Sequence, residues 1–193
     1  FRRGPQPADA LLHAGVRHGE RYLGQPFAVG YRSELLPQLP YWIQAVMGGL
    51  DTGAMLFADY GYPRREYYLP DRDQGTLRAF YRHRTHADAY LWPGLQDLTA
   101  SVDFTALAEA GTNAGFDLAG YTTQANFLLG NGLQERLDEA EARADAATLL
   151  RLRNEAKRLT LPSEMGERFQ LMGFSRDVEF GTAFLMNDLS WRL

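Results

Sequence analysis

A short apolar run in the first third of the chain is the pattern around which the other predicted elements are arranged. Met55 to Ala58 is apolar, stops at Asp59 and passes into the turn residues Gly61 and Pro63. A run too short for a helix and bounded by glycines is typical of a strand that is buried on both faces, and such strands indicate a parallel α/β sheet. Because ligands bind beyond the carboxyl ends of strands in open α/β sheets, Asp59 stands where chemistry would occur.

The residues before this run predict an irregular arm and then one helix. Residues 1–30 carry scattered glycine, proline and charge, which predicts an irregular arm with a helical turn near residues 8–14. Residues 27–31 are expected to be a short strand or an extended segment. Pro40 suits the first turn of a helix, and apolar residues recur at helical spacing from Trp42 to Leu50. Residues 31–62 are therefore predicted to form a helix followed by the central strand.

The residues from 104 to 193 predict the remaining helices and strands. Asp103 suits the N-cap of a helix over residues 104–110, and residues 116–123 follow as a strand. Residues 123–129 begin another helix, and a long helix is expected over residues 133–159, with a break possible after Leu150, where the apolar stripe drifts. Residues 168–175 form the last clear strand. This alternating order predicts a right-handed βαβ unit in a doubly wound sheet.

Residues 63–103 differ from an ordinary surface loop, because they are dense in aromatic and charged side chains. We interpret them as a structured lid. Arg78, Arg82, His83 and Arg84 lie beside Phe80 and Tyr81, which suits either base stacking with phosphate contacts or an internal clamp onto acidic residues of the lid. The acidic partners in the second interpretation would be Asp71, Asp73 and Asp88, and the overall acidity favours it. His83 and His86 lack a third ligand at metal-binding spacing, so no metal site is predicted.

Composition limits the classes of function. The chain has 193 residues, of which 45% are hydrophobic, and a net charge of −4, which indicates one packed domain and argues against nucleic-acid binding. Without cysteine it has no thiolate chemistry, and no stretch is long enough to cross a membrane. The sequence contains neither the Gly-x-Ser-x-Gly motif of hydrolases nor the Walker phosphate-binding loop of nucleotide hydrolases. Lys157 is the single lysine among many arginines, which favours a bacterial source.

Five separated motifs occur in one order along the chain. They are LFADYGYP (56–63), GTLRAFYRH (75–83), PGLQDLTASVDFT (93–105), TTQANFLLGNGL (122–133) and MGERFQLM (165–172). Together they resemble the MidA family of class I S-adenosylmethionine-dependent methyltransferases, whose mitochondrial relatives assist complex I assembly and are described as protein arginine methyltransferases. The resemblance covers residues 31–172 and implies a Rossmann-like sheet, S-adenosyl-L-methionine as cofactor and a protein substrate. It also implies a cytoplasmic location for a bacterial protein and the mitochondrial matrix for a eukaryotic one. In that fold residues 55–58 would belong to the fifth strand.

The resemblance also implies a missing part. Members of the family carry a Gly-rich loop after the first strand and an acidic residue after the second, and neither lies in this sequence. The chain is therefore expected to be the C-terminal half of one methyltransferase domain, with cofactor-binding residues that this chain leaves unknown. We expect the isolated chain to be inactive. Its unpaired strand edge and apolar face would favour self-association, with a homodimer as one outcome.

The candidate site residues follow from the chemistry of a guanidinium acceptor. Carboxylates would orient it by bidentate hydrogen bonds, and aromatic rings would stack on it. Asp59 and Tyr60 are the predicted catalytic residues, and Tyr62, Asp97 and Glu34 the predicted substrate-binding residues. Asp59 could instead only cap a turn. The alternative function is a non-catalytic domain for protein binding or assembly, which would use the lid and the long helix after residue 133.

Overall fold

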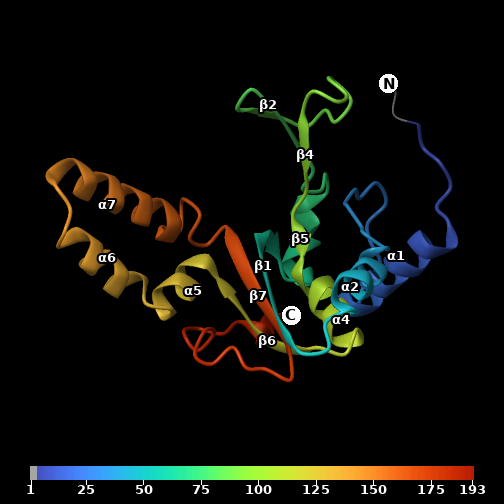
Figure 1. The fold of residues 1–193 in the computed structure, drawn as a ribbon. Coiled ribbons are helices and arrows are strands. Elements are labelled where there is room, and N and C mark those ends of the chain that lie inside the picture. Colours follow the sequence, from blue (N-terminus) through green and yellow to red (C-terminus); the bar gives the residue numbers. More distant parts are fainter. Residues whose placement is uncertain (1–3) are drawn as a thin grey trace.

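A mixed sheet lies at the centre of the structure, a computed structural model that describes residues 4–193 (Figure 1). Within those residues the sheet has four strands in the order β5–β1–β7–β6. β1 and β5 pair in parallel, whereas β7 runs antiparallel to both β1 and β6. The strands are β1 (Gly53–Tyr62), β5 (Val102–Asp103), β6 (Asp117–Thr123) and β7 (Phe169–Arg176).

This arrangement confirms the α/β fold class but corrects the predicted parallel sheet, because β1 pairs antiparallel with β7 over eight residues and parallel with β5 over only two. The two predicted strands of the βαβ unit, β1 and β6, point the same way but do not pair, because β7 lies between them. β1 is also not buried on both faces. Its residues alternate between partly buried and exposed from Gly53 to Ala58, and Leu56 is 46% exposed. Between Gly53 and Tyr60, β1 has no strand partner on the side opposite β7 among the described residues.

Two helices cover one face of the sheet. α2 (Leu39–Met47) has Pro40 in its first turn, and α4 (Phe104–Asn113) begins where the Asp103 carboxylate accepts a hydrogen bond from the Ala106 amide at 3.0 Å. Both features confirm the predicted helices. The two helices and β7 share a core of fully buried side chains, each of which contributes on the order of 1.5–3 kcal/mol. That core includes Ile43, Met47, Phe104, Met172 and Phe174.

Close packing of α4 on the sheet depends on one glycine. A Cβ atom at Gly111 would lie 2.3 Å from the ring of Phe174, so only glycine allows the helix to approach β7 this closely.

Residues 10–23 are helical, so the prediction of an irregular arm was wrong there, whereas residues 4–9 and 24–30 are irregular as predicted and the predicted helical turn near residues 8–14 coincides with the start of the helix. α1 (Ala10–Leu23) begins at Asp9, whose carboxylate accepts a hydrogen bond from the Leu12 amide at 2.8 Å, and ends at Gly24 in a left-handed conformation. Residues 27–31 form no strand; they are followed by an isolated bridge between Arg32 and Gln74. Residues 1–3 of the predicted arm lie outside the described residues.

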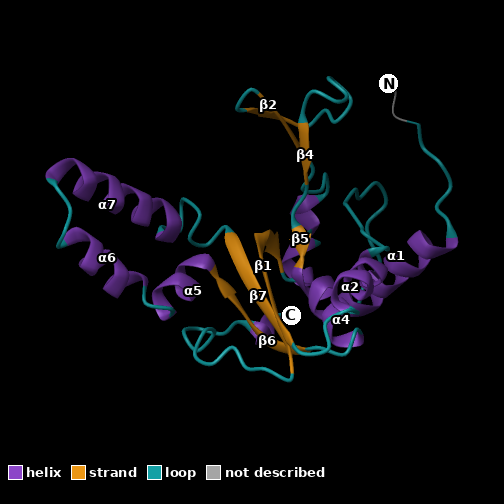
Figure 2. Ribbon diagram, viewed as in Figure 1, coloured by secondary structure: helices purple, strands orange, loops and turns teal. Residues whose placement is uncertain are grey.

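Residues 63–103 are folded and extend from the central sheet (Figure 2). A short three-stranded antiparallel sheet forms their outer part, in the order β3–β2–β4. The segment consists of α3 (Arg64–Tyr67), the 3₁₀ helix η1 (Pro70–Arg72), β2 (Arg78–Tyr81), β3 (Arg84–His86), β4 (Asp97–Thr99) and β5. Its action as a lid stays a prediction.

The predicted long helix is two helices. α5 (Gln124–Gly130) leads into α6 (Leu133–Glu141), and α7 (Ala146–Thr160) starts at Asp145, whose carboxylate accepts from the Thr148 amide at 2.8 Å. The break therefore lies before Asp145 and not after Leu150. α6 and α7 pack against each other and project away from the sheet (Figure 1). The chain then returns through β7 to a short 3₁₀ helix, η2 (Ser190–Arg192).

Candidate active site at the carboxyl end of strand β1

β1 changes partner at its carboxyl end. Its last pair with β7 is Tyr60 with Phe169, and the next residue, Gly61, pairs instead with Val102 of β5. A Cβ atom at Gly61 would lie 2.2 Å from the Val102 carbonyl oxygen, so glycine is required for this close pairing. The change of partner separates β1 from β7, and a cavity lies on each side of the strand end.

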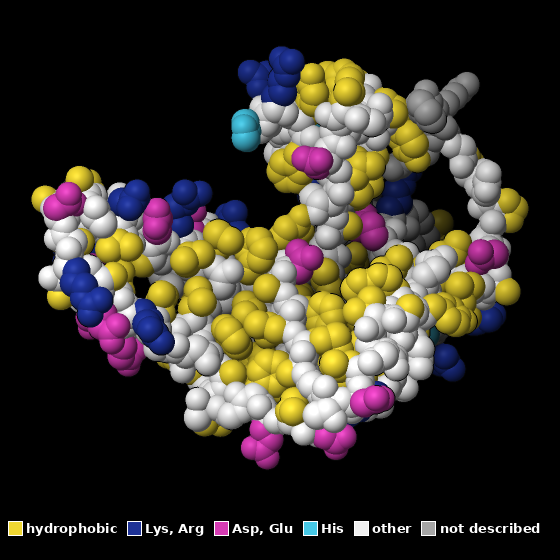
Figure 3. All heavy atoms as spheres, viewed as in Figure 1, with side chains coloured by type: hydrophobic (Ala, Val, Ile, Leu, Met, Phe, Trp, Pro, Cys, Tyr) yellow, Lys and Arg dark blue, Asp and Glu magenta, His cyan; other side chains and the backbone are white. Residues whose placement is uncertain are grey.

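An apolar cavity of about 660 Å³ lies on the side of α2 and α4. Trp42, Phe57 and Tyr67 contribute aromatic walls, and Asp59 and Glu34 contribute carboxylates. Burial raises the pKa of Tyr67 to about 12, so its phenol stays protonated at neutral pH. Figure 3 shows apolar side chains gathered over the central part of the molecule, where β1 and β7 lie in Figure 1.

Three carboxylates line this cavity, those of Glu34, Asp59 and Asp103, and they differ in their contacts. Glu34 accepts hydrogen bonds from the Thr76 amide and hydroxyl, both at 2.8 Å, and from the Leu77 amide at 3.1 Å. It therefore holds the loop before β2 in place. Asp59 accepts only from its neighbouring Tyr60 amide at 2.8 Å and forms no ion pair within residues 4–193. Its charge is thus available to a ligand, although the bond to Tyr60 also fits the capping interpretation.

A more polar cavity of about 980 Å³ lies between the end of β1 and strands β6 and β7. Tyr60 and Tyr62 line it. The Tyr60 hydroxyl hydrogen-bonds to the Thr99 hydroxyl of β4, and its ring meets Phe169 edge-on at 5.5 Å between centroids. The guanidinium of Arg72 stacks on the Tyr62 ring, with its Cζ atom 3.8 Å from the ring centroid. The structure therefore places four of the five predicted residues around one strand end, in two cavities.

The fifth predicted residue lies farther out. Asp97 is the first residue of β4, is exposed, and pairs with Phe80 of β2. It lines neither of the two cavities. A role for Asp97 in substrate binding stays a prediction.

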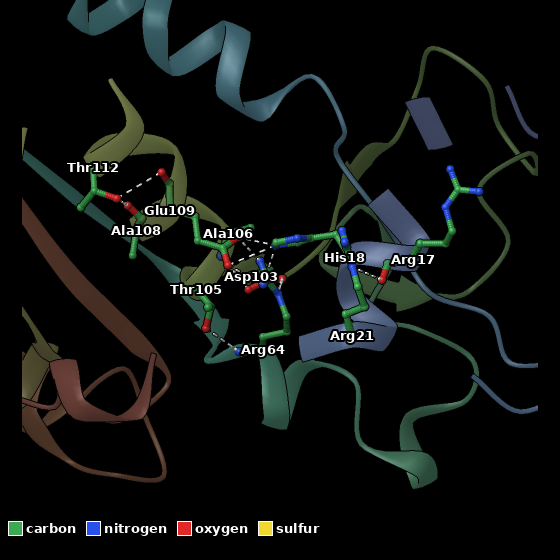
Figure 4. Close-up of polar contacts among 10 residues, drawn as sticks. All are labelled: Arg17, His18, Arg21, Arg64, Asp103, Thr105, Ala106, Ala108, Glu109 and Thr112. Atoms are coloured by element: carbon green, nitrogen blue, oxygen red, sulfur yellow. Dashed lines mark hydrogen bonds and ion pairs between the residues drawn. The ribbon is translucent and has the colours of Figure 1, made fainter. Parts of the chain in front are cut away.

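A buried ionic cluster that pattern analysis missed fixes the turn after Tyr62 (Figure 4). Arg64, 3% exposed, donates from both terminal nitrogens to Glu109 of α4, at 2.7 Å each, and from Nε to Asp103 at 3.1 Å. His18 of α1 lies 3.1 Å from Glu109, and the Arg64 amide donates to the Thr105 hydroxyl at 2.9 Å. The cluster therefore joins α1, α3 and α4 behind the candidate site.

The pKa values in this cluster follow from burial and pairing. Burial alone would raise the pKa of Glu109, but the hydrogen bonds and charge of Arg64, and then those of His18, lower it below its ordinary value. For Asp103, burial is the larger effect and raises the pKa despite Arg64 and the Ala106 amide. Arg64 directly follows the motif LFADYGYP, and Asp103 lies in the motif PGLQDLTASVDFT; these two positions were the sequence signals for the cluster.

The basic hairpin of the predicted lid does not form the expected clamp. Among the described residues, Arg78, Arg82 and Arg84 pair with none of Asp71, Asp73 and Asp88, so that interpretation was wrong. Arg82 and His83 have positive φ angles of 47° and 62° in the turn between β2 and β3, and Arg82 lies over the Tyr81 ring.

No group of three or more metal-binding side chains occurs within residues 4–193. None of the helices there is long and apolar enough to span a membrane.

Comparison with known proteins defines the class of protein. Residues 6–122 match the family described as "Putative S-adenosyl-L-methionine-dependent methyltransferase". The chain belongs to this family, which confirms the resemblance carried by the motifs.

Curated relatives are similar over the same region. The chain is 35% identical over 120 residues to the zebrafish (Danio rerio) mitochondrial protein arginine methyltransferase NDUFAF7, a match that covers 62% of this chain and 26% of the relative. The human protein is 33% identical over 121 residues, with 62% and 25% covered. The match thus spans about a quarter of the length of these relatives.

Two solved structures from Burkholderia thailandensis have the same fold. One, bound to S-adenosyl-homocysteine, is 44% identical with a TM-score of 0.80, and the match covers 85% of this chain and 42% of that protein. The other, a native structure of an uncharacterized protein, is 43% identical with a TM-score of 0.79, and covers 83% and 43%.

The described residues fit only part of the cofactor that this family implies. The apolar cavity offers the aromatic rings of Trp42 and Phe57, which suit one wall of a pocket for an aromatic base. No strand within residues 4–193 is followed by a Gly-rich turn that would let the backbone approach the cofactor closely. One wall of a cofactor pocket is therefore present, not a complete one.

Proposed function

We propose that the polypeptide containing this chain transfers a methyl group from S-adenosyl-L-methionine to an arginine of a partner protein, and that this chain forms the acceptor side of the active site. Membership of the methyltransferase family supports the reaction class. The relatives named as arginine methyltransferases support the acceptor, and the neighbour bound to S-adenosyl-homocysteine supports the cofactor. The structural observation that carries the proposal is the position of Asp59, Tyr60 and Tyr62 beside two cavities at one strand end.

This chain's residues would position the acceptor. The cofactor, when bound, supplies an electrophilic methyl group. A guanidinium presents N–H donors in a planar fork, which suits a carboxylate without another partner, and Asp59 is such a carboxylate. Aromatic faces bind the guanidinium plane, as the stacking of Arg72 on Tyr62 illustrates. Holding the acceptor nitrogen in a single orientation and excluding water account for much of the rate gain in such a transfer.

The surrounding features suit a protein substrate. Residues 63–103 contact the site through the Tyr60–Thr99 hydrogen bond and would act as its lid. We further propose that the protein works in the bacterial cytoplasm, from its arginine-rich composition and its similarity to Burkholderia proteins. For a eukaryotic protein we propose the mitochondrial matrix, which the relatives named as mitochondrial proteins support.

Methyl transfer by the complete protein tests the proposal. Peptides that differ only by arginine or lysine at one position would be incubated with S-adenosylmethionine labelled in its methyl group. Label is expected on the arginine peptide only, and mass spectrometry would locate it on the side chain. Label on neither peptide, nor on any protein of a source-cell extract, would favour the non-catalytic alternative.

A further inference from the structure

The polar cavity beside β1 contains two buried polar groups without a partner. Tyr121 of β6 is 0% exposed and Gln170 of β7 is 8% exposed, and both line the cavity. The Tyr121 hydroxyl and the Gln170 Oε1 atom form no hydrogen bond with any residue from 4 to 193. Buried polar groups in proteins are nearly always hydrogen-bonded. The Gln170 oxygen can only accept, and the Tyr121 hydroxyl can donate or accept, so the two groups at one cavity indicate a ligand that supplies at least one hydrogen-bond donor.

An arginine of the chain itself reaches the same cavity. Arg192 and Glu66 both line it and form an ion pair. The segment that carries Arg192 is fastened to β6, because the Leu189 amide donates to the Tyr121 carbonyl at 2.6 Å and Asp188 accepts from the Tyr121 amide at 3.1 Å. These two hydrogen bonds fix the segment on β6 and thereby place the Arg192 guanidinium at the cavity.

The groups at this cavity suit a guanidinium. A guanidinium has five N–H donors and no acceptor, so its site needs acceptors from the protein. Glu66 offers a carboxylate, Gln170 an amide oxygen, and Tyr121 a hydroxyl that can also accept. Burial raises the pKa of Tyr121, with Arg192 opposing and Glu66 reinforcing that rise, so the phenol stays neutral and close to both charges.

We propose that this cavity binds the side chain of the substrate arginine, and that Arg192 occupies the position of that arginine until the substrate displaces it. The inference rests on the proposed function for the identity of the ligand. It adds Tyr121, Gln170 and Glu66 to Tyr60 and Tyr62, which line the same cavity, and it assigns Arg192 as an internal competitor. Asp59, the strand partner of Gln170, lies in the adjoining apolar cavity.

A binding experiment on the complete protein tests this assignment without methyl transfer. The probe is N-acetyl-arginine-N-methylamide, titrated by calorimetry in the absence of cofactor, and the citrulline analogue is the neutral comparator of the same shape. Arg192→Gln removes the competitor and should tighten binding of the arginine probe about tenfold. Glu66→Gln and Tyr121→Phe should each weaken it, the former by about tenfold. Glu179→Gln, at an exposed position outside the cavity, should change nothing.

The outcomes separate this inference from the proposed function. Equal binding of the arginine and citrulline probes, or no gain in Arg192→Gln, overturns the cavity assignment. A melting curve of each variant shows whether a loss of probe binding results only from unfolding. If Glu66→Gln is unstable, Tyr121→Phe still tests the site, because it removes the hydroxyl and keeps the buried ring. Arginine methylation with an unchanged KM in Glu66→Gln would keep the proposed function and reject this site. Probe binding that depends on Glu66 without any methylation would keep the site and reject the proposed function.

Discussion

Arg64 and Glu109 face each other in a two-point ion pair, with the Nη1 and Nη2 atoms of Arg64 each 2.7 Å from a different carboxylate oxygen of Glu109 (Figure 4). The pair joins the turn after β1 to α4, the helix that packs on β7. Because Arg64 also binds Asp103, the N-cap of α4, one side chain connects the candidate site to the core. Rigid support of this kind is what a site needs to hold its side chains in one geometry.

Replacement of Arg64 tests the stability of this connection. Arg64→Met keeps an unbranched chain but leaves Asp103, whose side chain is 12% exposed, without its charge partner. Breaking a buried pair from one side costs about 3–5 kcal/mol, and we expect the lower end because the Glu109 side chain is 36% exposed. Urea unfolding of the complete protein would measure the loss. Arg65→Met, at the neighbouring exposed position, is the matched control and should change stability little.

The lowered pKa of Glu109 predicts a loss of stability in acid. A carboxyl whose folded pKa is depressed stabilises the fold fully above its unfolded pKa, near 4.5, and loses that contribution as the pH falls through the folded pKa. Asp103 acts in the opposite direction, since its folded pKa is raised. The melting temperature should therefore fall less between pH 7 and acid in Glu109→Gln than in the unmodified protein. The exposed pair of Arg151 and Glu155 supplies a control, because Glu155→Gln should leave the pH profile as it was.

Asp59→Asn separates acceptor recognition from turn capping. Asparagine keeps the size and can still accept from the Tyr60 amide, but it has no charge. Loss of one charge-assisted hydrogen bond of about 1.5–3 kcal/mol should lower kcat/KM for an arginine peptide roughly ten- to a hundredfold. The melting temperature should stay close to that of the unmodified protein. Normal turnover with a lower melting temperature would instead make Asp59 a capping residue only.

The unpaired edge of β1 predicts the behaviour of residues 1–193 in isolation. From Gly53 to Tyr60 this edge has no strand beside it within the described residues, and Leu56, Trp42 and Val46 are about half exposed nearby. Such an edge and apolar surface favour association. We expect the isolated chain to self-associate, for example as a homodimer, and to bind S-adenosylmethionine poorly. Ultracentrifugation would measure the oligomeric state, and calorimetry would measure binding of S-adenosylmethionine. A monodisperse monomer that binds S-adenosylmethionine with micromolar affinity would refute this expectation.

Local signals in the sequence were sufficient for several elements. Asp103 begins α4, Pro40 lies in the first turn of α2, and residues 169–176 form a strand, each within a few residues of the prediction. Caps and apolar periodicity act over three or four residues, so they can be identified from the sequence alone. Only a helical turn near residues 8–14 was predicted where α1 forms, although Asp9 caps the helix, because Gly15 and Gly19 lower helix propensity. Gly19 is buried against Phe27, a tertiary contact that compensates for that cost.

The order of residues therefore determined the family, through five motifs in a single arrangement, and the strand end at which Asp59, Tyr60 and Tyr62 lie. Tertiary structure alone decided that β7 separates β1 from β6 and sets Gln170 opposite Asp59. It also decided that Arg64 meets Glu109 and that Arg192 meets Glu66. These partners are far apart along the chain, and no periodicity encodes which strand edge or which charge a distant residue will meet. Long-range pairing is selected by how the whole sheet and its helices bury their apolar faces together.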